Sequence, residues 1–144
     1  MVQVGHVPAL ICDFTSDTGL IERSLASIQA TGSTALVDSV YFATQHLRGA
    51  ANSRHALFIL SDGGENSSRY TKGELNNLIQ EADVCIYSIA LSRWLRLSLE
   101  GDVLLLKHLA EETGGRFYQV ACIASLPQAV WKLSLAMRSL HVLY

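Results

Sequence analysis

Hydrophobic and polar positions follow one another along the chain in blocks that predict short strands joined by helices. The five uninterrupted apolar residues Ala56–Leu60 predict a strand that is covered on both faces. Apolar residues at helical spacing predict helices between the strands. The expected elements are strand 7–14, a helix from 18 to about 29, helix 34–47, strand 56–60, helix 72–82, strand 84–91, helix 102–110, strand 116–120 and helix 126–140.

Polar residues and glycines mark the ends of several of these elements. Thr71 with Glu74, and Ser125 with Gln128, have the spacing of capping boxes at helix starts. The pair Gly114–Gly115 predicts the end of the helix before it. These signals support the boundaries that the apolar pattern indicates.

The alternation of strands and helices predicts an α/β fold. We expect a three-layer, mostly parallel, doubly wound (Rossmann-like) sheet with helices on both faces. A length of 144 residues suits a single domain, 1–144. Ligands of such sheets bind outside the carboxyl ends of the strands. The loop that follows strand 56–60 leaves one of these ends, and it is therefore the first place to look for chemistry.

Composition excludes several classes of protein. Hydrophobic residues make up 49% and charged residues 17%, as in folded globular chains. A net charge of −2 argues against a nucleic-acid partner. No apolar run approaches the roughly 20 residues that cross a membrane, and no signal peptide is recognisable, so we expect no membrane insertion. The three cysteines, Cys12, Cys85 and Cys122, lack Cys-x-x-Cys spacing and are expected to be buried and reduced.

Oxygen-bearing side chains gather directly after strand 56–60. Ser61 and Asp62 come first, and Glu65 and Asn66 follow Gly63–Gly64. A hard cation such as Mg²⁺ prefers oxygen ligands, and glycines let the backbone turn closely around a site. The alternative, which these residues taken alone favour, is a polar turn that caps the next helix along the chain.

A second segment, "TGSTALVDSV" (31–40), turns into a helix near Thr34, which alone would be a helix cap. Together, "GSTALVDSV" and "LFILSDGGENSS" resemble the von Willebrand factor A (vWA) domain family. "VCIYSIAL" and "LAEETGGRFYQV" are similar to that family's next two segments, in the same order. "ICDFTSD" resembles a stretch common in bacterial members. The resemblance covers nearly the whole chain.

The resemblance implies a metal-ion-dependent adhesion site. In the family a divalent cation, usually Mg²⁺, is held by an Asp-x-Ser-x-Ser motif, a threonine and an aspartate, and an acidic residue of a partner protein completes its coordination. Thr34 matches the threonine and Asp62 the aspartate. Ser61, Asp38, Glu65 and Asn66 are candidates for a secondary shell around the metal. The resemblance therefore implies a protein-binding module rather than an enzyme.

The chain departs from the family at the first motif. No Asp-x-Ser-x-Ser occurs, and the nearest string, Asp13–Asp17, has the wrong spacing. We expect an N-terminally truncated vWA-like domain that lacks the first strand and helix, so that the remnant site binds Mg²⁺ or another divalent cation weakly or not at all. The strand at 56–60 would then have an exposed edge. Three outcomes are open: Val2–Phe14 fills the edge, a second copy pairs with it in a homodimer, or the strand order is rearranged.

Two other classes of function stay open. One is a structural or self-association module with no working metal site, for which Arg93, Trp94 and Arg96 are candidate interface residues. The other is a hydrolase, which the sequence disfavours because it has neither Gly-x-Ser-x-Gly nor His-Glu-x-x-His. Many bacterial members of the family are exported, so the sequence leaves the compartment open.

Overall fold

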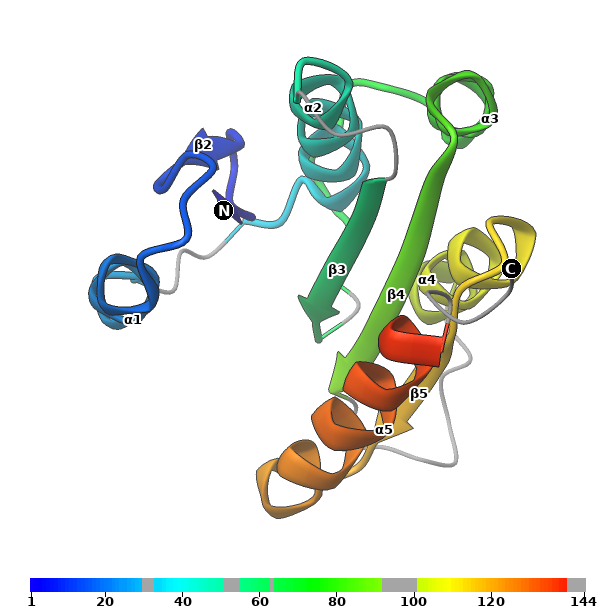
Figure 1. Cartoon of the computed structure of the whole chain (residues 1–144). Helices are drawn as coiled ribbons and strands as arrows, with labels where there is room; N and C mark the ends of the chain where they lie inside the picture. Colours follow the sequence, from blue (N-terminus) through cyan, green and yellow to red (C-terminus); the bar gives the residue numbers. More distant parts are fainter. Residues whose placement is uncertain (30–32, 51–54, 63, 92–100, 140–144) are drawn as a thin grey trace. The chain divides into compact units, whose positions relative to one another are not determined.

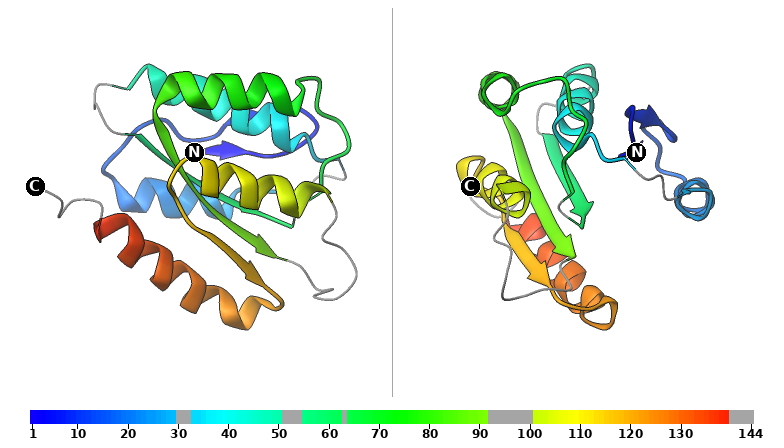
Figure 2. Two further views of the ribbon diagram at one scale, coloured as in Figure 1. Left: turned by 90° about the vertical axis from the view of Figure 1, so that its right-hand side faces the viewer. Right: turned by 180° about the vertical axis from the view of Figure 1, so that it is seen from behind.

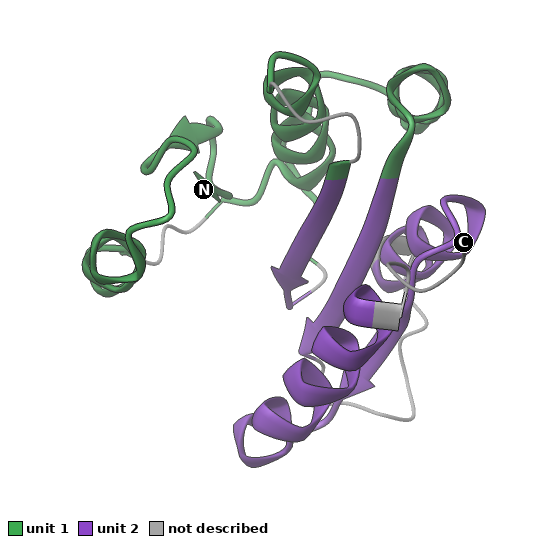
Figure 3. Cartoon of the chain, viewed as in Figure 1, with its two compact units in different colours: residues 1–55, 64–84 green, residues 56–63, 85–144 purple. Residues whose placement is uncertain are grey.

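The computed structural model describes residues 1–29, 33–50, 55–62, 64–91 and 101–139 (Figure 1). The chain divides into two compact units (Figure 3). Unit 1 comprises residues 1–55 and 64–84, and unit 2 comprises residues 56–63 and 85–144.

Unit 2 is built on a parallel sheet with the strand order β3-β4-β5. The strands are β3 (His55–Ser61), β4 (Val84–Leu91) and β5 (Phe117–Val120), and the first residue of β3 and of β4 belongs to unit 1. β4 and β5 pair in parallel, with Ser88 opposite Phe117, and the arrow of β3 runs the same way in Figure 1. The expected parallel α/β sheet is thereby confirmed.

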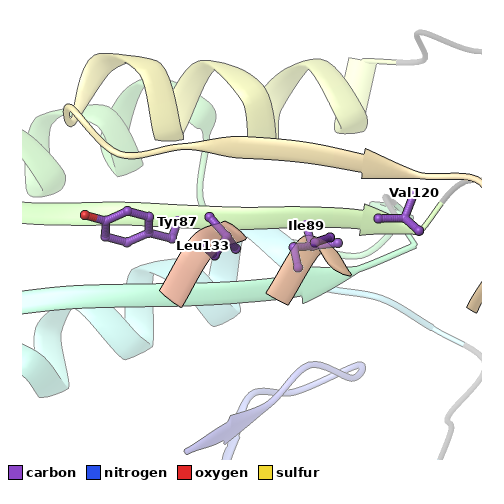
Figure 4. Packing of buried hydrophobic residues seen from close by; sticks show 5 residues of the cluster. Tyr87, Ile89, Val120 and Leu133 are labelled. Atoms are coloured by element: carbon purple, nitrogen blue, oxygen red, sulfur yellow. The ribbon is translucent and has the colours of Figure 1, made fainter. Parts of the chain in front are cut away.

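Helices cover both faces of the β4–β5 part of this sheet. Ser88 Oγ donates a hydrogen bond of 2.9 Å to the Leu106 carbonyl of α4 (Gly101–Glu112). Tyr87 and Ile89 flank Ser88 and therefore point to the opposite face. There they pack with Val120 and with Leu133 of α5 (Leu126–Ser139), as Figure 4 shows. The right-hand view of Figure 2 shows the strands running between these two helices.

Unit 1 is organised around two helices that pack on each other, α2 (Leu36–Arg48) and α3 (Lys72–Ala82). Apolar residues spaced along α3, among them Leu75 and Ile79, are buried as the helical pattern predicts. The capping box is confirmed, because the Thr71 hydroxyl accepts from the Glu74 N–H while the Glu74 carboxylate accepts from the Thr71 N–H.

The N-terminal segment of unit 1 differs from the expected single strand over 7–14. It forms a two-residue hairpin of β1 (Val2–Gln3) and β2 (Ala9–Leu10), which pair antiparallel as a separate sheet. Of the three open outcomes, the one in which Val2–Phe14 fills the edge of the main sheet is therefore wrong. Pro8 explains part of this, since it has no N–H for a longer ladder.

Two contacts tie the rest of this segment to α2. Asp13 Oδ1 lies 2.9 Å from Nε2 of His46, and the Phe14 ring stacks on the His46 imidazole with centroids 4.8 Å apart. The next helix, α1 (Thr18–Ala26), has no buried residue, and both Leu20 and Leu25 are exposed. Its apolar face is exposed.

Two further expectations need correction. β3 is not covered on both faces, because Phe58 is 44% and Leu60 43% exposed. Cys122 is exposed, whereas Cys12 is buried and Cys85 half-buried. Within the described residues, no helix is both long enough and apolar enough to span a membrane.

Candidate functional site

The N-terminus of α2 is capped by a loop that lies about thirty residues further along the chain. Ala35 occupies the N-cap position and has no side-chain acceptor for the free N–H groups that every helix start presents. Two side chains of segment 64–70 accept these groups instead, Glu65 from Val37 at 2.8 Å and Ser68 from Asp38 at 3.2 Å. Asn66 accepts the N–H of Thr34, the residue before the N-cap, at 3.0 Å.

Glu65 is the centre of this cap. Besides the bond from Val37, its carboxylate accepts from the Ser67 N–H at 3.1 Å and from Ser68 twice, through the N–H at 2.9 Å and the hydroxyl at 2.6 Å. Partial burial alone would raise the pKa of Glu65, but the bonds from Ser68, Val37 and Ser67 outweigh it and hold the pKa below its ordinary value. The negative charge also suits the positive end of the helix dipole.

Asp38 holds the far end of the same loop. It lies in the first turn of α2 and is 3% exposed. Its Oδ1 accepts from the backbone N–H groups of Arg69 at 2.8 Å and Tyr70 at 2.9 Å. The Tyr70 ring then stacks on Tyr41 of α2, with centroids 3.9 Å apart. Asp38 thus holds the backbone at Arg69 and Tyr70, and the stacked Tyr70 ring attaches the same segment to α2.

Thr34 is attached to this loop through its backbone. Its N–H donates to Oδ1 of Asn66, and its carbonyl accepts from the Asn66 N–H, each at 3.0 Å. Asn66 follows Asp62 by four positions in the sequence. The backbone of Thr34 is therefore bound to segment 64–70 of the same unit.

The structure brings together four of the candidate residues, Thr34, Asp38, Glu65 and Asn66, in unit 1. Ser61 is the half-buried last residue of β3, and Asp62 is exposed; both belong to unit 2. The convergence of Thr34 with Asp62 stays a prediction. The candidate interface residues Arg93, Trp94 and Arg96 lie outside the described residues.

The chemistry of this cluster fits a cation only in part. A threonine hydroxyl and an aspartate carboxylate are donors that Mg²⁺ accepts. The oxygens of Asp38, Glu65 and Asn66, by contrast, accept backbone N–H groups, which makes them loop-positioning groups. Over the part of the chain that the structure describes, no group of three His, Cys, Asp or Glu residues could hold a metal ion.

Ser68 and Tyr70 are the residues of this cluster that sequence reasoning misses. The Ser68 hydroxyl accepts from the Asp38 N–H and donates to the Glu65 carboxylate, and Tyr70 supplies the ring that stacks on Tyr41. The available signal is Ala35, since a helix that begins at an alanine needs its cap from elsewhere.

The sheet and helices define a vWA-like fold. The chain aligns with an aerotolerance-related membrane protein from Bacteroides fragilis carrying multiple mutations to serines, over 96% of this chain and 78% of that one, at 15% identity and a TM-score of 0.69. It aligns with the conserved hypothetical protein BatB from Bacteroides thetaiotaomicron over 93% and 78%, at 14% identity and 0.64.

The vWA domain of SpRpn10 is also similar, over 83% of this chain and 61% of that one, at 16% identity and a TM-score of 0.56. No family model matches the chain, and no curated protein matches it. At these identities the likeness concerns the fold alone, so the function has to be argued from this chain's own residues.

Proposed function

We propose that this chain is a non-enzymatic, vWA-like protein-binding module. Thr34 and Asp62 would hold a divalent cation weakly, and the cation would bind an acidic side chain of a partner protein. The observation that carries the proposal is the reciprocal pair of hydrogen bonds between Thr34 and Asn66, both 3.0 Å long. This pair fixes the backbone of Thr34 to the segment that continues from Asp62.

Weak binding follows from the number of ligands. Mg²⁺ gives up its water reluctantly and is bound well only where protein oxygens replace several waters in good geometry. Thr34 and Asp62 supply two side chains, while the carboxylates of Asp38 and Glu65 are already bonded to backbone N–H groups. Water molecules would fill most coordination positions of such a cation, and a partner's carboxylate could replace one of them.

A metal titration of thermal stability tests the cation. If the Kd for Mg²⁺ is on the order of 1 mM, 10 mM Mg²⁺ stabilises the folded chain by about 1.4 kcal/mol. For a chain of this size we expect the melting temperature to rise by about 5 °C. Asp62→Asn should abolish the rise, because it removes the charged ligand without changing the size of the side chain.

Asp83→Asn is the matched control. Asp83 is an exposed aspartate at the C-cap of α3 with φ 49°, a conformation that asparagine also adopts readily. This variant should keep the full response to Mg²⁺. A response that survives Asp62→Asn, or none at any metal concentration, contradicts the cation part of the proposal. A shift of several degrees at micromolar metal, lost in Asp62→Asn, would show a stronger site than proposed.

A further inference from the structure

β3 is an edge strand of the described sheet, and its side chains are unusual for that position. β4 is its one neighbour in this sheet (Figure 1). Natural edge strands carry charges, prolines or bulges that discourage pairing with another chain. Residues 56–60 contain no charge and no proline.

The exposed side chains of β3 lie on one face of the strand. Ala56, Phe58 and Leu60 alternate with Leu57 and Ile59, so the first three point the same way. All three are exposed, whereas Ile59 on the other face is buried. β5, at the other side of the sheet, is four residues long and follows the charged Arg116, so it offers a shorter and less apolar edge.

We propose that β3 pairs antiparallel with β3 of a second copy of this chain, which joins the two three-stranded sheets across a twofold axis. Pairing centred on Phe58 places this ring opposite the partner's Phe58. It also places Ala56 opposite the partner's Leu60, so a small side chain meets a large one on either side of the aromatic pair. A second copy is the fitting occupant because the strand complements itself in this register.

Charge and area indicate the strength and the size of this assembly. A net charge of −2 and an uncharged strand leave little repulsion between two copies. Two short strands bury less than the roughly 800 Å² per partner of a standard interface, so we expect a concentration-dependent dimer. Each chain has one β3, and its free edge is fully paired in the twofold dimer. We therefore expect assembly through β3 to stop at two copies.

Sedimentation velocity of the full chain over a concentration series, with EDTA present, tests the proposal separately from the metal site. We expect a monomer–dimer equilibrium for the wild type. Phe58→Glu should give monomer at the same concentrations, because two like charges would then face each other across the axis. Ile123→Glu is the matched control, since Ile123 is 77% exposed and lies outside the sheet; it should dimerise as the wild type does.

Disulfide trapping gives a second readout that tolerates weak binding. Cα atoms of directly opposite residues in an antiparallel pair lie about 4.5–5.5 Å apart, within the range that disulfides bridge. Phe58→Cys in a Cys122→Ser background should therefore form a covalent dimer under mild oxidation, while Ile123→Cys in that background should not. A wild type that stays monomeric and does not cross-link, or a dimer that survives Phe58→Glu, would overturn the proposal.

Discussion

Gly115→Ala should destabilise unit 2 by about 3 kcal/mol or more, which is a large part of the 5–15 kcal/mol typical of a domain. Gly115 lies against the backbone of β4, where an added Cβ would be 2.7 Å from the carbonyl carbon of Ile86 and closer still to its oxygen. A backbone carbonyl cannot rotate away as a flexible side chain could, so β4 or the start of β5 has to move. Chemical denaturation followed by circular dichroism measures the loss.

Gly114→Ala provides the comparison at the adjacent position. Gly114 has φ 74°, which costs an alanine about 1 kcal/mol, but nothing lies within 4 Å of an added Cβ. We therefore expect a loss of about 1 kcal/mol for this variant, clearly smaller than that of Gly115→Ala. Equal losses at the two positions would show that strain in the turn, and not contact with Ile86, explains the glycine pair.

The strands and helices that sequence predicts well are those whose apolar residues find neighbours within the same unit. β4 has the predicted bounds, Val84–Leu91, and α3 begins at the predicted capping box. Residues 56–60 of β3 form an uninterrupted apolar run, yet Phe58 and Leu60 are exposed. An apolar pattern shows which residues can be buried, but it does not show whether another element is present to cover them.

The candidate site is predictable in its membership and not in its hydrogen bonding. The sequence groups Thr34, Asp38, Glu65 and Asn66, and the structure brings the four together. From the sequence we expect the oxygens of these four residues to surround a cation. In the structure, the side chains of Asp38, Glu65 and Asn66 accept backbone N–H groups instead. Metal ligands and helix caps are made from the same residue types, because both need oxygen acceptors. What distinguishes them here is the alanine at the N-cap of α2.

Glu65→Ala should destabilise unit 1 by about 2 kcal/mol, because it leaves N–H groups of Val37, Ser67 and Ser68 without their acceptor in a half-buried loop. Glu65→Gln keeps one acceptor oxygen and should lose less. Glu74→Ala is the control, since it removes a carboxylate from the exposed capping box of α3 and should have a smaller effect. A loss for Glu65→Ala no larger than that for Glu74→Ala would contradict the role of Glu65 as the main cap.

The same carboxylate should make stability depend on pH in the acid range. The folded-state pKa of Glu65 lies below the ordinary value of 4.5, so its contribution is fully present above that pH and is lost as the pH falls through the folded pKa. The free energy of unfolding of the wild type should therefore exceed that of Glu65→Gln most at pH 6, and the difference should shrink below about pH 4.5. The pKa values of Asp13 and Glu74 are lowered as well, by bonds from Phe14 and Thr71, but both proteins share these groups and their effects cancel in the difference. A difference between the two proteins that stays constant from pH 6 to pH 3 would mean that the charge of Glu65 contributes nothing, and that the shape of its side chain alone holds the loop on α2.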